Sequence, residues 1–290
     1  MSDKLFEASE IKEMVRARYG EIAAGTAAGC CAPAASSCCG PATAPAADGK
    51  ARAMGYSADE LAAVPEGANL GLGCGNPQAI AAMQPGEVVV DLGSGAGFDC
   101  LLAARQVGAA GRVIGVDMTH EMLAKARGNA ARVGVANVEF RLGEIEHLPI
   151  GDNAADVILS NCVVNLVPDM AQVFREAFRV LKPGGRFAVS DVVVRGEVHD
   201  EVRKSMLLWV RCIAGALEEN EYQARLAAAG FSAISLEPTR VYNIEDARQF
   251  LTEAGIDVDT IAPQVDGKFM SAFVRATKPA APCCAPGCCA

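Results

Sequence analysis

The sequence predicts an α/β fold with a mostly parallel, doubly wound sheet, and two observations support this prediction. Residues 88–97 read VVVDLGSGAG, in which three valines run into an acid and then into a glycine-rich turn. This pattern is typical of a buried first strand followed by a turn that needs glycine, because a Cβ would block both the tight turn and the approach of a ligand. Helix and strand patterns then alternate along the chain, as they do where helices cover both faces of a parallel sheet.

A second predicted strand, at residues 112–118, carries the acid Asp117 near its end. Asp117 follows Gly95 by 22 positions, the separation at which an acid at the end of strand two can bind ribose hydroxyls. The glycine spacing is G-x-G-x-G, whereas dinucleotide-binding turns have G-x-G-x-x-G. A nucleoside without phosphates, S-adenosylmethionine, therefore fits this turn better than NAD does.

Further elements follow in the same alternating order. We expect a strand at residues 155–161, a helix at 169–180 and, after the turn LKPGGR, a strand at 187–191. Beyond residue 195 the pattern changes, and it predicts helices at 202–217, 219–229 and 244–254 and strands at 232–236 and 270–277.

These patterns divide the chain into five parts. Residues 1–24 form an amphipathic helix, and residues 25–50 are a Cys/Ala/Pro-rich segment that we expect to be mobile, because it has too little apolar surface to bury. Residues 51–194 form the S-adenosylmethionine-binding core, residues 195–277 a substrate-binding and C-terminal portion, and residues 278–290 a Cys-rich mobile tail.

Composition narrows the class of function. The net charge of −9 and the isoelectric point near 5.0 argue against nucleic acid as the main partner. No apolar run approaches the roughly 18 residues of a membrane span, and the first residues lack the apolar stretch of a signal peptide. We therefore expect a cytoplasmic enzyme with no nucleic-acid or membrane partner, and we favour a monomer.

The chain has twelve cysteines. Eight form adjacent pairs, and the four single ones are Cys74, Cys100, Cys162 and Cys212. A secreted disulfide framework is not expected without a signal peptide. In a reducing compartment such an excess of thiols indicates metal binding, redox chemistry or a thiophilic substrate, although any one cysteine also packs well in a core.

Three of the single cysteines have distinctive surroundings: GLGCGNP around Cys74, SNCVVNL around Cys162 and CIAGAL from Cys212. Residues 70–195 resemble the class I S-adenosylmethionine-dependent methyltransferases. The three cysteine motifs occur in this order around that core, and with them residues 10–277 closely resemble the arsenite S-adenosylmethionine methyltransferases. The resemblance implies that Cys162 and Cys212 hold trivalent arsenic throughout the reaction and that Cys74 takes part in the first methylation. Cys100 matches no such motif, and we expect it in the core.

The resemblance also implies a cofactor pocket and a chemistry. The implied pocket residues are Asp91, Gly93, Ser94, Gly95, Gly97, Asp117, Met118, Glu144, Ile145 and Asn161. Trivalent arsenic is soft and three-coordinate, so three thiolates satisfy it and leave its lone pair free to attack the sulfonium methyl group. Catalysis then depends mainly on positioning. The implied products are mono- and dimethylated arsenicals for detoxification, and turnover should need a thiol reductant such as glutathione or thioredoxin.

Several alternatives stay open. The family has a fourth functional cysteine near the N-terminus, thought to pair with the counterpart of Cys74, and the candidates are Cys30, Cys31, Cys38 and Cys39. These pairs either capture arsenite or belong to a tail without a catalytic role, and the C-terminal pairs pose the same question.

A different Rossmann-like enzyme is the alternative to the methyltransferase fold. The alternative functions are methyl transfer to an organic small molecule and thiol-rich metalloid binding on an inactive methyltransferase fold.

Overall fold

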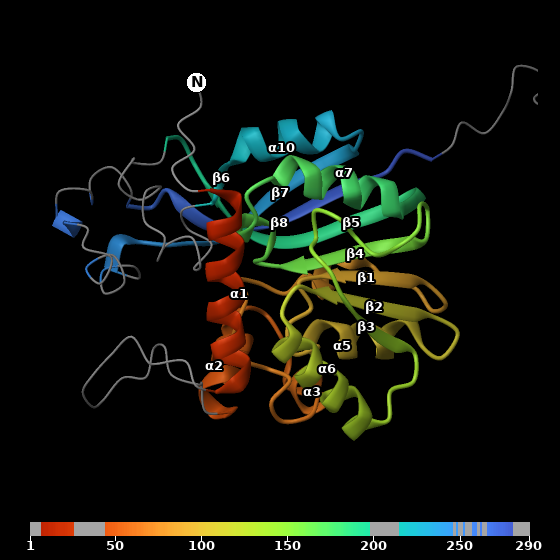
Figure 1. Ribbon diagram of the computed structural model, residues 1–290. Helices are drawn as coiled ribbons and strands as arrows, with labels where there is room; N and C mark the ends of the chain where they lie inside the picture. The colour runs from red at the N-terminus through yellow and green to blue at the C-terminus, as the bar shows by residue number, and fades with distance from the viewer. Residues whose placement is uncertain are drawn as a thin grey trace, which may run out of the picture.

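One mixed sheet organises the described part of the chain in the computed structural model, which covers residues 7–25, 44–197, 215–245, 248, 252, 257–259, 262 and 266–280. The strand order is β3-β2-β1-β4-β5-β8-β7, and β6 pairs with β5. The strands are β1 Val88–Leu92, β2 Arg112–Asp117, β3 Val138–Leu142, β4 Ala155–Asn161, β5 Leu181–Val194, β6 Leu217–Glu218, β7 Ser232–Val241 and β8 Phe269–Thr277. Strands β1 to β5 are mutually parallel, and β8 runs antiparallel to both of its neighbours, β5 and β7. The predicted doubly wound α/β fold is therefore confirmed (Figure 1).

Helices cover both faces of this sheet. The helices are α1 Ala8–Ala24, α2 Ala44–Ala53, α3 Ala58–Ala62, α4 Gln78–Ala81, α5 Phe98–Val107, α6 His120–Val133, the 3-10 turn η1 Val164–Leu166, α7 Met170–Val180 and α10 Glu219–Ala228. Helices α7 and α10 pack on one face, and α4, α5 and α6 pack on the other. None of the described helices is long and apolar enough to cross a membrane.

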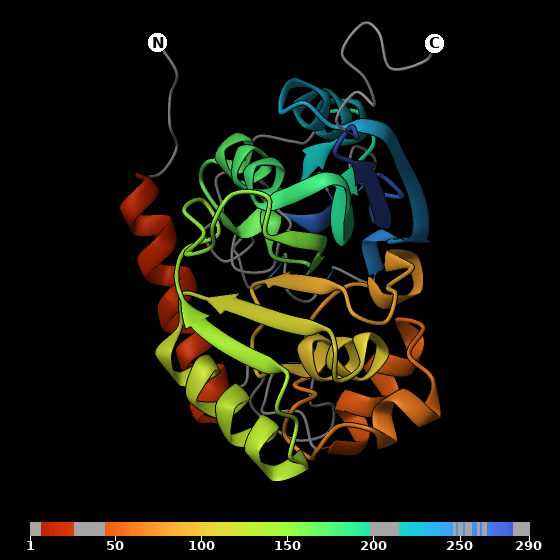
Figure 2. The same cartoon turned by 90° about the vertical axis from the view of Figure 1, so that its right-hand side faces the viewer.

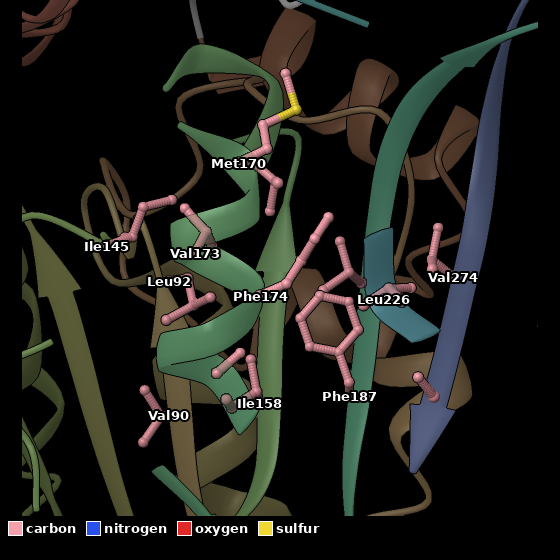
Figure 3. Packing of buried hydrophobic residues seen from close by; sticks show 14 of the residues in the cluster. Val90, Leu92, Ile145, Ile158, Met170, Val173, Phe174, Phe187, Leu226 and Val274 are labelled. Carbon is pink, nitrogen blue, oxygen red and sulfur yellow. The ribbon is translucent and has the colours of Figure 1, made fainter. Parts of the chain in front are cut away.

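The larger apolar cluster lies beneath α7 and α10 (Figure 3). Phe174 of α7 is fully buried, with its ring centroid 6.1 Å from that of Phe187 on β5. Leu226 of α10 is also fully buried in this cluster. Burying each such side chain stabilises the fold by about 1.5–3 kcal/mol. Because the central strands are covered on both faces, they appear in the sequence as continuous apolar runs rather than alternating ones.

Helix α1 stands across the end of the sheet toward which β4 points (Figure 1), and it runs along the side of the molecule in the turned view (Figure 2). It begins with a capping box between Glu7 and Glu10 and ends at Gly25, whose φ of 72° is left-handed. Ile11 and Val15 form its buried stripe. The predicted N-terminal amphipathic helix is therefore present, and its place beside the carboxyl ends of the strands makes it part of the candidate site.

Two local features of the structure were not predicted from the sequence. Strand β3 was not predicted, because its apolar residues alternate with Glu139 and Arg141 and it lies at the edge of the sheet. Residues 44–50 of helix α2 fall within the segment that we expected to be mobile. Its alanines Ala47 and Ala51 are fully buried, since alanine favours helices and its small side chain allows close packing. Residues 26–43 of that segment lie outside the described residues.

Some of the elements predicted beyond residue 195 are confirmed and others are not. Helix α10 and strand β8 agree with the predicted helix at 219–229 and strand at 270–277, and β7 is longer than the predicted strand at 232–236. Leu217 belongs to strand β6 rather than to the end of a helix, while residues 202–214 of that predicted helix lie outside the described residues. The predicted helix at 244–254 is described only at residues 244, 245, 248 and 252, which are helical.

Candidate functional site

A cavity of about 610 Å³ opens where β1, β2 and β4 end. Its volume is in the range of pockets that hold small molecules. The predicted residues that line it are Asp91, Gly93, Ser94, Gly95, Asp117, Met118, Ile145, Asn161 and Cys162. Helix α1 forms a further wall through Lys12, Val15 and Tyr19.

The glycine turn leaves this cavity open because its backbone takes conformations that other residues avoid. Gly93 has a φ of 72°, and a Cβ on it would lie 2.5 Å from Val163 Cγ1. Gly97 has a φ of 88° and begins α5, where a Cβ would lie 3.0 Å from the Phe140 ring. Gly97 does not line the cavity, so in this structure it serves the turn and its packing.

Three buried acids face the cavity: Asp91, Asp99 and Asp117. Burial raises the pKa of all three carboxyls, and the charge of Asp99 raises that of Asp91 further. Backbone N–H groups of Gly95 and Thr119 donate to Asp117 at 2.9 and 2.8 Å. Carboxyl groups at this place fit S-adenosylmethionine, because the positive charge of a bound sulfonium would favour their ionised form.

Ion pairs hold α1 against the loop that follows β3. Lys12 Nζ lies 2.7 Å from Glu144 Oε2 and 3.1 Å from Glu146 Oε1. The Glu146 side chain is only 5% exposed. Burial lowers the pKa of Lys12, but the hydrogen bonds with these two carboxylates outweigh it, so the pKa is raised overall. Glu144 does not line the cavity, and its side chain contacts Lys12 and Arg16 of α1 instead.

Two of the predicted arsenic ligands, Cys74 and Cys162, come together beside the cavity. Burial raises the pKa of the Cys74 thiol, and its contact with the Cys162 thiol raises it further. Cys74 Sγ lies 3.5 Å from Ser190 Oγ, and the Cys162 backbone N–H donates to the Ser190 carbonyl at 2.7 Å. Cys162 has a φ of 62°, a left-handed conformation that costs energy in a residue with a Cβ.

The other cysteines do not join this pair in the described structure. Cys100 is fully buried in α5, where its thiol donates to Asp91 Oδ2 at 3.2 Å, so its predicted place in the core is confirmed. Cys212 lies outside the described residues, as do all eight cysteines of the adjacent pairs. The third implied arsenic ligand therefore stays a prediction.

Sequence reasoning missed several polar residues around the thiols. Asp99 accepts hydrogen bonds from Tyr56 and Gln78, and Asn161 connects this group to Cys74. An acid in the first turn after a glycine loop was the available signal for Asp99. The loop position of Tyr56 carries no comparable pattern, because its contact depends on how α2 packs against the core.

Comparisons with known proteins agree with this geometry. A family profile described as a methyltransferase domain matches residues 83–230. The chain is 46% identical over 276 residues to the arsenite methyltransferase of Halobacterium salinarum, covering 93% of this chain and 67% of that protein. It is 44% identical over 182 residues to the arsenite methyltransferase of Aquipseudomonas alcaligenes, covering 60% of this chain and 52% of that protein. The chain thus spans between half and two thirds of the length of these two curated relatives.

Among solved structures, the chain is similar to CrArsM, an arsenic (III) S-adenosylmethionine methyltransferase from Chlamydomonas reinhardtii. The TM-score is 0.60 and the identity 33%, with 82% of this chain and 74% of that chain covered. The stretch that the family profile matches contains the glycine turn, Asp117 and Cys162. The chain therefore belongs to the arsenite methyltransferase family, within the class I S-adenosylmethionine-dependent methyltransferases.

Proposed function

We propose that this protein methylates trivalent arsenic, as arsenite or its thiol conjugates, with S-adenosylmethionine as methyl donor. The observation that carries the proposal is the meeting of Cys74 and Cys162 beside the cavity that the glycine turn forms. An organic acceptor would not need two thiols there, whereas a thiophilic atom does.

The residues that line the cavity would bind S-adenosylmethionine and orient it. Asp117 would hold the ribose, Met118 and Ile145 would border the adenine, and Asp91 and the backbone from Gly93 to Gly95 would face the methionine part. Glu144 would act at the adenine side by anchoring α1 through Lys12, and Gly97 by shaping the turn. When bound, S-adenosylmethionine supplies a methyl group on a positively charged sulfur, which the lone pair of thiolate-bound arsenic can attack.

The raised pKa of the Cys74 thiol suits this substrate. Arsenite carries hydroxyl groups, so each arsenic–sulfur bond that forms can send the thiol proton to a departing hydroxyl, which leaves as water. A thiol that stays protonated until the substrate arrives therefore needs no separate base. We assign Cys162 and Cys212 to holding arsenic through every step, and Cys74 to the first methylation.

Other parts of the proposal concern turnover. A thiol reductant, glutathione or thioredoxin, would restore the reduced enzyme, and the products would be mono- and dimethylated arsenicals in a detoxification role. No disulfide joins Cys74, Cys100 or Cys162, the cysteines that the structure describes, and we place the enzyme in a reducing, cytoplasmic environment. The pairs that include Cys30, Cys31, Cys38 and Cys39 would capture arsenite before transfer to the site.

The test is methyl transfer to arsenite by the purified full chain with S-adenosylmethionine and a thiol reductant, followed by arsenic speciation. Methylated arsenic is the expected product. Bound S-adenosylmethionine without any arsenic product would favour an organic acceptor. Arsenite binding without S-adenosylmethionine binding would favour a metalloid-binding protein on an inactive fold.

A further inference from the structure

The side-chain amide of Asn161, at the end of β4, joins two segments that are far apart in the sequence. Its Oδ1 accepts a hydrogen bond from the Cys74 backbone N–H at 2.9 Å. Its Nδ2 donates to the Gly75 carbonyl at 2.7 Å. Because Cys162 follows Asn161 directly, two neighbouring residues supply one thiol and hold the loop that carries the other.

This contact leaves little room for adjustment. Gly73 has a φ of 106°, and a Cβ on it would lie 2.7 Å from the Asn161 amide. A Cβ on Gly75 would lie 2.2 Å from Ser190 Oγ. The glycines on either side of Cys74 therefore allow the loop to lie directly against β4 and β5, where the amide of Asn161 can reach its backbone.

A second set of contacts orients the amide itself. Asn161 Nδ2 also donates to the Tyr56 hydroxyl at 3.1 Å, and that hydroxyl donates to Asp99 Oδ1 at 2.8 Å. Asp99 lines the cofactor cavity, and it accepts a further hydrogen bond from Gln78 at 3.0 Å. A continuous chain of hydrogen bonds thus runs from a carboxylate of the cofactor cavity, through Tyr56 and Asn161, to the backbone of Cys74.

We propose that Asn161 is a positioning residue that fixes the Cys74 thiol beside Cys162 and, through Tyr56, ties this placement to Asp99 of the cofactor cavity. The expected effect of Asn161 on arsenic binding rests on the proposed function, whereas its effect on the position of the Cys74 loop does not. Both amide groups are used: the oxygen by Cys74, and the nitrogen by Gly75 and Tyr56. Loss of the side chain leaves these partly buried backbone groups without partners, which a shift of the loop would relieve.

The test compares the alkylation rates of Cys74 and Cys162 by iodoacetamide, measured by peptide mass spectrometry on the reduced full chain. The variants are Asn161→Ala and the milder Tyr56→Phe, which keeps the ring and removes only the hydroxyl. The matched control is Asn137→Ala, because the Asn137 amide also donates two hydrogen bonds to backbone carbonyls, at 3.0 and 2.9 Å, but to Ala104 and Gly108 away from the thiols. Each protein is also tested for protection by arsenite and for its Kd for S-adenosylmethionine.

We expect Asn161→Ala, which removes both hydrogen bonds to the Cys74 loop, to alkylate at Cys74 about tenfold faster than the unaltered protein. Tyr56→Phe removes only the hydroxyl that orients the amide, and should alkylate there about threefold faster. Asn137→Ala should lower the melting temperature without this change at Cys74. The arsenite concentration that half protects Cys74 should rise about tenfold in Asn161→Ala, in line with the same loss.

Two results would overturn the proposal. One is an unchanged rate at Cys74 in Asn161→Ala with a weakened Kd for S-adenosylmethionine, which would make Asn161 a cofactor contact alone. The other is an equal rate increase in Asn161→Ala and Asn137→Ala, which would reflect general destabilisation. If arsenite protects neither thiol in the unaltered protein, the proposed function fails instead, and the alkylation rate of Cys74 still decides the positioning role.

Discussion

The carboxylate of Asp117 at the end of β2 accepts a hydrogen bond of 2.9 Å from the backbone N–H of Gly95, in the turn after β1. Its second oxygen accepts one of 2.8 Å from the Thr119 N–H at the start of α6. Asp117 therefore braces the glycine turn as well as facing the cavity. The acid 22 positions after the turn, which the sequence indicated as a ribose ligand, has a structural role in the same site.

Replacement of this acid should weaken cofactor binding. We expect Asp117→Ala to raise the Kd for S-adenosylmethionine by roughly 10- to 100-fold, because hydrogen bonds to a charged group contribute about 1.5–3 kcal/mol each. Isothermal titration calorimetry measures the effect. Asp152→Ala is the control, since Asp152 is a largely exposed acid paired with Arg179. Equal affinities of the two variants would show that Asp117 does not contact the cofactor.

The ion pairs of Lys12 should hold α1 in place over the cavity. We expect Lys12→Met to lower the free energy of unfolding by about 1–3 kcal/mol, because it leaves the buried Glu146 carboxylate without its partner. Affinity for S-adenosylmethionine should fall with it. Arg175→Met removes an exposed pair with Asp169 and should cost less than about 1 kcal/mol. Urea denaturation of both variants tests the difference, and equal losses would contradict a bracing role for Lys12.

The raised pKa of the buried Asp191 carboxyl should make the stability of the protein depend on pH. Burial raises its pKa from 3.8 to about 8, so between these values the folded protein holds a proton that the unfolded chain has released. The free energy of unfolding contributed by this group therefore falls as pH rises from about 4 to about 8. Asp191→Asn removes that loss.

The melting temperature of Asp191→Asn should accordingly exceed that of the unaltered protein by a margin that widens from pH 5 to pH 8 and then levels off. Differential scanning calorimetry at several pH values measures it. Asp152→Asn, at a largely exposed acid, is the control for the effect of an acid-to-amide change itself. A constant margin for Asp191→Asn would mean that its carboxyl is ionised across this range.

Cys74 and Cys162 should differ in the arsenic substrates whose methylation requires them. We expect Cys74→Ser to lose methylation of arsenite but to keep methylation of a monomethylated trivalent arsenical, which has one coordination position fewer for a protein thiol. Initial rates on the two substrates, with speciation of the products, test this division. Equal loss on both substrates would assign Cys74 the same role as Cys162.

Much of the site was predictable because it depends on local sequence. The glycine turn, Asp117 and the end of β4 at Cys162 each follow from a strand and the residues just after it. Ligands bind at the carboxyl ends of parallel strands, so these residues had to meet. Cys74 was placed beside them by its glycine-rich surroundings and by the family resemblance.

The rest depends on tertiary packing that no local pattern records. Tyr56 reaches Asp99 only because α2 packs against the core, and α2 arises from an alanine-rich stretch with no apolar periodicity. Strand β3 lies at the edge of the sheet, so its alternating residues carried a weaker signal than the buried strands did. The contact of Asn161 with Cys74 links residues 87 positions apart.

The central claim is that Cys162 holds arsenic beside the cofactor cavity, and the most direct measurement compares arsenite methylation by Cys162→Ser and by Cys100→Ser. Both variants replace one sulfur by oxygen, and both should bind S-adenosylmethionine. We predict that Cys162→Ser yields no methylated arsenic from either arsenite or the monomethylated substrate, while Cys100→Ser retains activity. Methylation by Cys162→Ser at the rate of the unaltered protein would contradict the claim.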